Sequence, residues 1–116
     1  MRHQSNKITL DRKTAGRRSL VANLAESLIL HGKITTTKAK AKVTRSTVEK
    51  LVTIAKENNL TARRKLMKTL YTANAIKKLM EVYGPKYKEV KGGYTRIVTL
   101  KNRLGDGAEV AVVEFI

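Results

Sequence analysis

Apolar side chains in the first part of the chain repeat at the spacing of one helix face. Three leucines stand four residues apart between positions 20 and 28, and an apolar residue follows each of them. Because residues four apart lie on one side of an α-helix, the pattern predicts a helix over residues 15–31. Thr14 can cap its first turn, and Gly32 suits the left-handed conformation that often follows a last turn.

The same spacing predicts three further helices between residues 38 and 83. The first covers residues 38–58, the second is shorter and begins at a capping Thr61, and the third begins at Thr72 and stops at Gly84-Pro85. Their apolar positions, which we expect to face the core, are Val48, Leu51, Val52, Ala55, Leu66, Met67, Leu70, Ala75, Ile76, Leu79, Met80 and Tyr83.

Short segments on either side of these helices favour β-strands. Residues 33–37 are rich in β-branched side chains, residues 94–100 change to a period of two, and residues 109–116 form a largely apolar run. A turn region with Gly105 and Gly107 separates the last two segments, so we expect them to pair as an antiparallel hairpin.

The order of the predicted elements is helix, strand, three helices and two strands. This order predicts an α/β fold in which a small mixed sheet packs against helices. We expect a single globular domain over residues 14–116, preceded by an extended arm over residues 1–13. Because only 4% of the residues are aromatic, we expect the core to consist of aliphatic side chains and methionine.

Positive charge dominates the composition. The 116-residue chain has 25 Lys and Arg residues against nine Asp and Glu residues, a formal net charge of +16. Ordinary protein surfaces mix both signs, so this excess favours a polyanionic partner. The basic residues form four clusters: the arm and the helix start after it (Arg2, Lys7, Arg12, Lys13, Arg17 and Arg18), one face of the second helix (Lys38, Lys42 and Arg45), the run Arg63-Arg64-Lys65, and a loop (Lys86, Lys88 and Lys91).

The first eighteen residues indicate what this partner is. Only Ile8 and Leu10 are sizeable apolar side chains there, which is too little hydrocarbon to order the arm without a partner. Arg17 and Arg18 fall in the first turns of the predicted helix, where the helix dipole disfavours cations. A phosphate at this position would contact both the free N–H groups and the arginines, so the pattern favours a nucleic acid.

Residues suited to catalysis or metal binding are scarce. The chain has no cysteine and two histidines, and its acids are scattered singly. We therefore expect no enzymatic activity, no metal, no cofactor and no small-molecule substrate. No apolar stretch is long enough to span a membrane, and the N-terminus lacks the apolar segment of a secretory signal, which predicts a cytoplasmic protein.

Two features near residue 93 each allow two interpretations. Gly92-Gly93 could let the backbone approach RNA closely, or could simply start the following strand. Tyr94 could stack on a base, with Arg96 on the same strand face pairing with phosphate, or it could pack into the core.

The kind of nucleic acid depends on which motifs accompany the basic clusters. The sequence holds neither a zinc finger or major-groove reading motif nor the paired aromatic residues of a single-strand binder, which favours folded RNA recognised by its backbone and shape. Two other classes stay open. A free regulator or chromosome-compacting protein needs a dimer or a groove-reading element, and an RNA-processing enzyme needs an acid–base pair or a metal cluster.

Ordered motifs along nearly the whole chain resemble one known family. They begin with Met1-Arg2-His3, Leu10-Asp11-Arg12, Arg17-Arg18 and Leu24-Ala25-Glu26-Ser27-Leu28-Ile29, continue with His31, Ile34-Thr35-Thr36 and Lys38-Ala39-Lys40, and end with Gly84-Pro85, Gly92-Gly93-Tyr94-Thr95-Arg96-Ile97 and Arg103-Leu104-Gly105-Asp106. Together they resemble the bacterial family of large-subunit ribosomal proteins numbered seventeen.

The resemblance implies a structural constituent of the large ribosomal subunit that binds large-subunit rRNA beside neighbouring ribosomal proteins, on the solvent side around the peptide exit. It implies a role in subunit assembly and translation, in the cytoplasm, with the arm and the basic helix faces contacting rRNA. The matching positions are Arg2, His3, Arg12, Arg17, Arg18, Thr36, Lys38, Lys40, Gly92, Gly93, Tyr94 and Arg96. From the basic clusters themselves we add Lys7, Lys13, Lys42, Arg45, Arg63 and Arg64 to the predicted RNA-binding residues.

Overall fold

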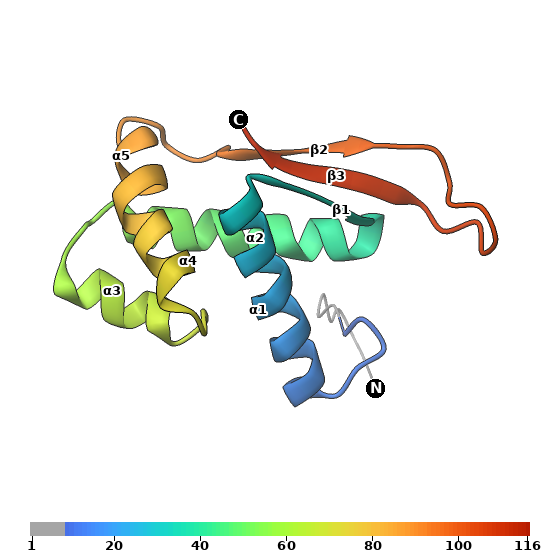
Figure 1. Ribbon diagram of the computed structural model, residues 1–116, viewed down its shortest axis with the longest axis horizontal. Coiled ribbons are helices and arrows are strands. Elements are labelled where there is room, and N and C mark those ends of the chain that lie inside the picture. The colour runs from blue at the N-terminus through green and yellow to red at the C-terminus, as the bar shows by residue number, and fades with distance from the viewer. Residues whose placement is uncertain (1–8) are drawn as a thin grey trace, which may run out of the picture.

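A three-stranded sheet lies on one side of the molecule, and the helices lie on the other (Figure 1). The computed structural model describes residues 9–116. Along the chain the elements are α1 (Thr14–His31), β1 (Lys33–Thr37), α2 (Lys38–Ala55), α3 (Leu60–Met67), α4 (Ala73–Lys78), the π-helical turn η1 (Leu79–Tyr83), α5 (Gly84–Lys86), β2 (Thr95–Thr99) and β3 (Val110–Phe115).

The predicted α/β class and the order of helices and strands are confirmed, but the sheet is not mixed. Its strand order is β1-β3-β2, and both pairs are antiparallel. The hairpin places β3 beside β2, and β3 also pairs with β1 on its other edge. The strands β1 and β2 run in the same direction, but β3 lies between them, so they do not pair. The register sets Val113 opposite both Ile34 and Ile97, which directs an apolar row toward the helices.

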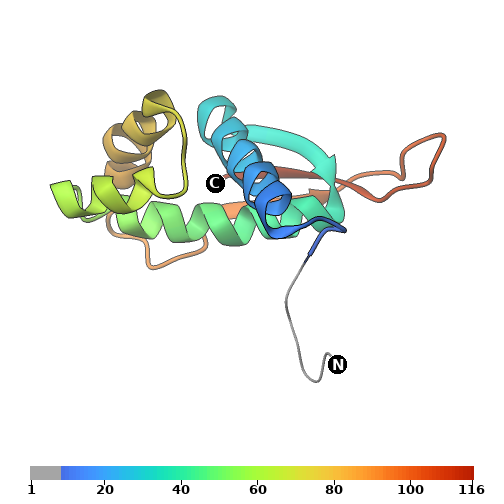
Figure 2. The same ribbon diagram turned by 90° about the horizontal axis from the view of Figure 1, so that it is seen from below.

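The helix α2 runs along the sheet, and α1 crosses α2 (Figure 2). The buried side chains of α2 fit the predicted apolar stripe, and Leu28 and Ile29 of α1 are fully buried beside them. The expectation of a core of aliphatic side chains and methionine is wrong at one end of the sheet, where the predicted core residue Tyr83 is joined by other aromatic residues. There, rings gather with centroids 4.0 Å apart for Tyr83 and Phe115 and 5.2 Å apart for Tyr87 and Tyr94.

The helix caps differ from the predicted ones at two of the three predicted positions. Lys13, rather than Thr14, occupies the N-cap position of α1, with no side-chain cap bond. Asn59, rather than Thr61, caps α3, since its Oδ1 accepts from the Ala62 N–H at 2.8 Å. Thr72 occupies the N-cap position of α4 as expected, but its side chain makes no cap bond.

The helical run after Thr72 does not stop at Gly84-Pro85 as predicted but continues to Lys86. The N–H of Gly84 donates to the Leu79 carbonyl five residues back, which is a π-helical bond. This wider turn accommodates Pro85, which has no N–H and would otherwise clash with the preceding helical turn. Gly84 also packs against the end of α2, where a Cβ would stand 3.0 Å from the Ala55 carbonyl oxygen.

The predicted arm is only partly within the described residues. The predicted RNA-binding positions Arg2, His3 and Lys7 lie outside them. The last residues of the arm form a turn rather than an extended chain: Leu10 and Asp11 have φ angles of 53° and 54°, and the Arg12 N–H donates to the Thr9 carbonyl at 3.1 Å.

The loop between β2 and β3 projects beyond the helices and is held by its own charges (Figure 1). Arg103 donates twice to the Asp106 carboxylate, from Nε at 3.1 Å and from a terminal nitrogen at 2.5 Å. This contact and the Ala108 N–H lower the pKa of Asp106 to about 2. Both charged side chains are exposed, so the pair fixes the shape of the loop more than it adds stability.

The helical glycines Gly16 and Gly84 give a matched test of the packing of Gly84 against the end of α2. We expect Gly84→Ala to lower the free energy of unfolding by about 1–3 kcal/mol, because its Cβ would press on backbone that cannot move away. Gly16→Ala, whose Cβ would meet only the flexible Arg12 side chain at 3.9 Å, should raise it by about 0.5–1 kcal/mol. Urea denaturation measures both, and equal effects of the two substitutions would contradict the packing described.

Candidate nucleic-acid interface

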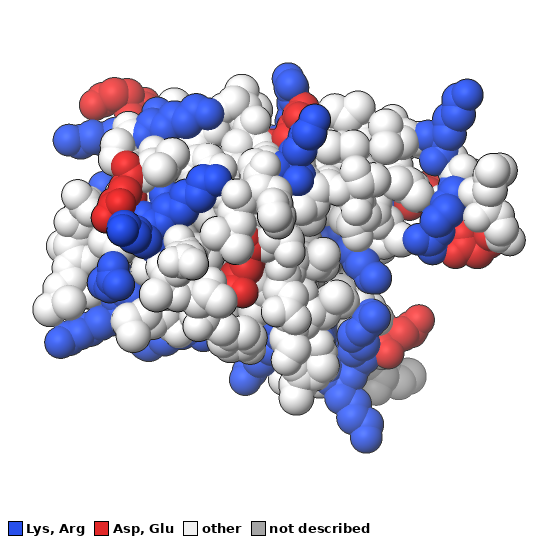
Figure 3. Space-filling view, in the orientation of Figure 1, with Lys and Arg blue, Asp and Glu red and all other residues white. Residues whose placement is uncertain are grey.

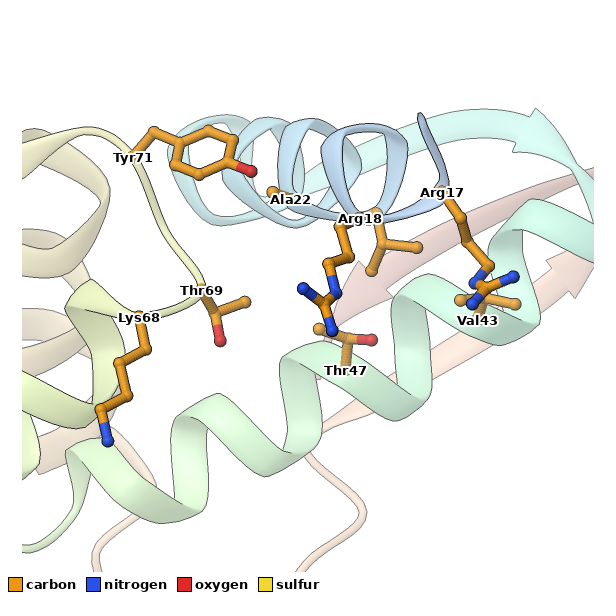
Figure 4. Close-up of a pocket in the computed structure, with 9 residues that line it drawn as sticks. Arg17, Arg18, Ala22, Val43, Thr47, Lys68, Thr69 and Tyr71 are labelled. Carbon is orange, nitrogen blue, oxygen red and sulfur yellow. The ribbon is translucent and has the colours of Figure 1, made fainter. Parts of the chain in front are cut away.

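A groove of about 400 Å³ lies between the first half of α1 and the middle of α2 (Figure 4). The segment between α3 and α4 closes one end of it. Its lining residues come from all three places and are Arg17, Arg18, Val21, Ala22, Val43, Thr47, Lys68, Thr69 and Tyr71. We call this hollow the α1–α2 groove.

The cations of the α1–α2 groove are spread along it, with Lys68 and Arg17 at opposite ends and Arg18 between them. Arg17 and Arg18 project from the first turns of α1, and Lys68 projects from the end of α3 (Figure 4). Of the predicted RNA-binding residues, the structure therefore brings Arg17 and Arg18 to a concave surface. Lys68 joins them although it was not among the residues predicted to bind RNA.

Between these ends the groove is partly apolar. Val21 and Ala22 of α1 and Val43 of α2 supply aliphatic side chains, and Thr47 and Thr69 supply hydroxyls. The Tyr71 side chain, 63% exposed, lies at the end formed by the α3–α4 segment. The lining thus offers hydrocarbon, hydroxyl and cationic groups within one hollow.

A buried carboxylate holds in place the end of the groove that the α3–α4 segment forms. Glu26 of α1, only 9% exposed, accepts from the backbone N–H groups of Tyr71 at 2.6 Å and Thr72 at 2.9 Å. The bonds satisfy N–H groups at the start of α4 and complement its dipole. They also fix the position of the α3–α4 segment relative to α1, and hence where this end of the groove closes.

Acidic side chains compensate the basic residues of the sheet region but not those of the groove. Glu114 pairs with Arg96 at 2.6 Å and Glu109 with Lys38 at 3.9 Å. Within residues 9–116, none of the ion pairs includes Arg17, Arg18 or Lys68. Figure 3 shows basic side chains around the outline of one face, with the few acidic ones mostly beside a basic one. The uncompensated charge at the groove favours a phosphate-bearing ligand.

The second predicted cluster lies on the opposite side of α2, next to β2. Lys42 and Arg45 line a separate hollow of about 290 Å³ together with Ser46, Glu49 and Ile97. Glu49 lies 3.7 Å from Arg45 and also accepts from the Tyr94 N–H, so it reduces the charge of this hollow. Lys40 is half-buried near the start of the same helix.

The cluster on α3 does not oppose the dipole of its helix. The helix is only eight residues long, so Arg64 and Lys65 lie in its last turn, where cations are favoured. Arg63 and Arg64 are exposed, and Arg63 lines a hollow that shares Tyr71 with the α1–α2 groove. The α3 cluster therefore flanks the groove without lining it.

Tyr94 packs in the core, so its ring is not available to stack on a base. The residue is 2% exposed, and its hydroxyl accepts from the Lys56 ammonium at 3.0 Å. Burial raises the pKa of Tyr94, but the contacts with Thr53 and Lys56 outweigh it, and the net effect lowers that pKa. Tyr94 precedes β2 and, contrary to expectation, does not share a face with the exposed Arg96.

The glycine pair before Tyr94 presents open backbone. Gly92 and Gly93 have φ angles of 101° and 68°, and a Cβ on either would meet nothing within 4 Å. The Lys56 ammonium also donates to the Val90 carbonyl, which anchors the loop just before the pair. An exposed backbone on an anchored loop can approach another chain closely. The structure is therefore compatible with both interpretations of the pair, a contact with RNA and the start of a strand.

The remaining predicted residues lie apart from the groove. Thr36 is half-buried in β1, while Arg12 and Lys13 are exposed in the segment that leads into α1. Among residues 9–116, no group of three or more His, Cys, Asp or Glu side chains could hold a metal ion, and no helix is long and apolar enough to cross a membrane.

The sequence patterns did not reveal Lys68, Thr47, Thr69 and Tyr71 as residues of the concave surface. Lys68 belonged to a visible basic run, and Tyr71 followed a predicted core position, but neither pattern shows that α3 ends beside α1. The signal that could have found them is a polar, hydroxyl-rich segment, Lys68-Thr69-Leu70-Tyr71-Thr72, between two short helices.

Known proteins resemble this chain over its full length. The large ribosomal subunit protein bL17 of Akkermansia muciniphila is 49% identical over 116 residues, covering 100% of this chain and 85% of the relative. That of a Sulfurihydrogenibium species is 48% identical, covering 100% and 97%, and that of Clostridium acetobutylicum is 45% identical, covering 92% and 94%. The sequence profile of the family described as ribosomal protein L17 matches residues 20–116.

A small basic α/β domain with these relatives is a protein of the large ribosomal subunit rather than an enzyme. The chain belongs to the ribosomal protein L17 family. This membership confirms the family suggested by the sequence motifs and the expectation of a non-enzymatic ribosomal protein.

The contact between Lys56 and the Tyr94 hydroxyl gives a testable prediction for the pKa of Tyr94. We expect Lys56→Met to raise the pKa of Tyr94, because the ammonium group that favours the phenolate is lost. Amide exchange in residues 90–93 should also become faster. An NMR titration of the Tyr94 ring measures the first effect, with Lys50→Met, an exposed lysine of the same helix, as control. An unchanged Tyr94 pKa would contradict the described contact.

Proposed function

We propose that this protein binds large-subunit rRNA through the α1–α2 groove, the N-terminal arm and the basic faces of α2 and α3, and that it thereby supports assembly of the subunit and translation. The observation that carries the proposal is the uncompensated charge of Arg17, Arg18 and Lys68 around one groove. Neighbouring proteins of the large subunit are its expected protein partners.

The start of α1 supports a phosphate ligand. The first turn of α1, which the structure describes in full, contains no acidic residue and carries Arg17, with Lys13 at the cap. Cations there are unfavourable for an isolated helix, and a phosphate removes the conflict by accepting from N–H groups and guanidinium groups together. The arm joins α1 at this same end, so one RNA segment can contact the arm and the groove.

The relatives support the choice of rRNA among polyanions. They are named as proteins of the large ribosomal subunit, and this chain matches them along 92–100% of its length. The exposed Gly92-Gly93 backbone and the exposed Lys42, Arg63 and Arg64 side chains add positions for backbone contacts outside the groove. Such contacts recognise folded RNA by shape rather than by base sequence.

Salt dependence tests the proposal. We expect the affinity for a cognate large-subunit rRNA fragment to fall steeply as salt rises, because phosphate contacts release counterions. The double variant Arg17→Ala/Arg18→Ala should bind more weakly and with a salt slope lower by about 2. The matched control Lys50→Ala/Lys77→Ala removes two exposed cations outside the groove and should change the slope less.

The fold of the double variant must be measured with its affinity. We expect its melting temperature to be unchanged or slightly higher, because two cations leave the positive end of a helix dipole. A flat salt response of the native protein would contradict the proposed function. Loss of folding in the double variant would show that the arginines are structural.

A further inference from the structure

We propose that the α1–α2 groove takes one unpaired ribonucleotide of the bound RNA, with its base against Tyr71 and Ala22 and its flanking phosphates at Lys68 on one side and at Arg18 and Arg17 on the other. This site rests on the proposed function and adds a specific ligand to it. It requires the groove to fit a nucleotide in size, in chemistry and in the order of its groups.

The size is suitable. The volume of about 400 Å³ falls within the range of roughly 300–1,000 Å³ typical of pockets for small organic groups. A double helix is too wide to enter such a hollow, and its bases are already stacked on one another. A base without a pairing partner can turn out of the helix and enter.

The interior matches a base. Val21, Ala22 and Val43 form the aliphatic part of the floor, and the Tyr71 ring reaches from the α3–α4 segment toward Ala22, whereas Val43 lies beside Arg17 (Figure 4). Tyr71 is the aromatic residue outside the ring cluster beside β3, and 63% of it is exposed. An aromatic ring held beside hydrocarbon is the usual surface for an unstacked base.

The ends match phosphates. Lys68 and Arg17 lie at opposite ends of the groove, and Arg18 lies between them above Thr47 (Figure 4). A nucleotide within a chain has a phosphate on each side, and the stretch beside Tyr71 and Ala22 likewise has Lys68 on one side and Arg18 on the other. The groove lining contains no acidic side chain. It therefore favours an anionic ligand over a cationic one.

The hydroxyls of the lining can recognise ribose. Thr44 and Thr53 of α2 donate their hydroxyls to carbonyls four residues back, at 2.8 and 3.1 Å. Among the hydrogen bonds within residues 9–116, none engages the hydroxyl of Thr47 or Thr69 in this way. With respect to residues 9–116, these two hydroxyls can therefore bond a 2′-hydroxyl, the group that distinguishes RNA from DNA.

The groove is also preorganised. Glu26 holds the backbone of Tyr71 and Thr72 from α1, so the ring and the floor belong to elements joined by buried hydrogen bonds. A ligand then orders little of the protein when it binds, which favours affinity.

The first experiment compares two RNA hairpins that differ by one bulged nucleotide, 2-aminopurine, whose fluorescence reports stacking. The native full-length protein should bind the bulged hairpin more tightly and quench the probe. Tyr71→Ala should lower the affinity for the bulged hairpin about tenfold and leave the affinity for the fully paired hairpin nearly unchanged. Tyr71→Phe should keep most of the affinity because it keeps the ring.

Leu60→Ala is the matched control, since Leu60 has the same exposed fraction of 63% and lies outside the groove. It should leave both affinities unchanged. If Tyr71→Ala and Leu60→Ala have the same effect, or if Tyr71→Ala weakens both hairpins equally, the proposed base site is wrong.

The second experiment tests the ribose contact. A bulged nucleotide with deoxyribose should bind the native protein several-fold more weakly than the ribonucleotide. The variant Thr47→Val/Thr69→Val should remove most of this difference, whereas Thr61→Val, an exposed threonine of α3, should not. An undiminished preference for ribose in the double variant would overturn this assignment of the hydroxyls.

The outcomes separate this site from the proposed function. If the native protein binds both hairpins equally with a steep salt response, the nucleotide site is wrong and the proposed function stands. If it binds neither hairpin and no large-subunit rRNA fragment, both are wrong. If Tyr71→Ala leaves RNA binding intact but weakens binding to a protein of the large subunit, the groove is a protein-binding site and the inference is overturned.

Discussion

The arrangement of the helices depends on the two hydrogen bonds that the Glu26 carboxylate accepts from the backbone of Tyr71 and Thr72. A buried carboxylate is unfavourable unless its charge is satisfied, and N–H groups at a helix start satisfy it well. The acid is thus used inside the fold, in a chain where cations are abundant. It joins α1 to the start of α4, and the core and the α1–α2 groove both require that junction.

The same use of acids explains where the positive charge remains. Glu49 accepts from the Tyr94 N–H and lies near Arg45, while Glu114 and Glu109 pair with cations next to the sheet. With only nine acids in the chain, these internal and sheet-side contacts leave few for the helical side. The groove side of the molecule therefore carries the charge that an RNA would neutralise, which agrees with membership in a family of large-subunit ribosomal proteins.

The sequence predicted those features that depend on local spacing. The helix ending at His31 follows from apolar positions at helical spacing, the strand Lys33–Thr37 from its β-branched residues, and the final hairpin from an alternating and an apolar segment joined by a turn; all lie where they were expected. The exact residues that cap and end the helices were harder to predict. Asn59 caps α3 because it lies one turn before a free N–H, and the π-helical turn lets Gly84-Pro85 continue a helix that such a pair normally ends.

The candidate site was predictable only in part, because it is built by contacts between distant segments. Arg17 and Arg18 were identified from their conflict with the helix dipole, which is a local property. Lys68 and Tyr71 reach the same groove only because Glu26 holds their segment against α1. The sequence allowed two interpretations of Tyr94, since the alternation around it does not reveal that Lys56 and Thr53 bind its hydroxyl in the interior.

A density map of the large ribosomal subunit that contains this chain would show directly what occupies the α1–α2 groove. We expect RNA between α1 and α2, with phosphates beside Arg17, Arg18 and Lys68. A groove that faces solvent or is filled by another protein, with RNA only on other surfaces of the chain, would contradict the role we assign to it.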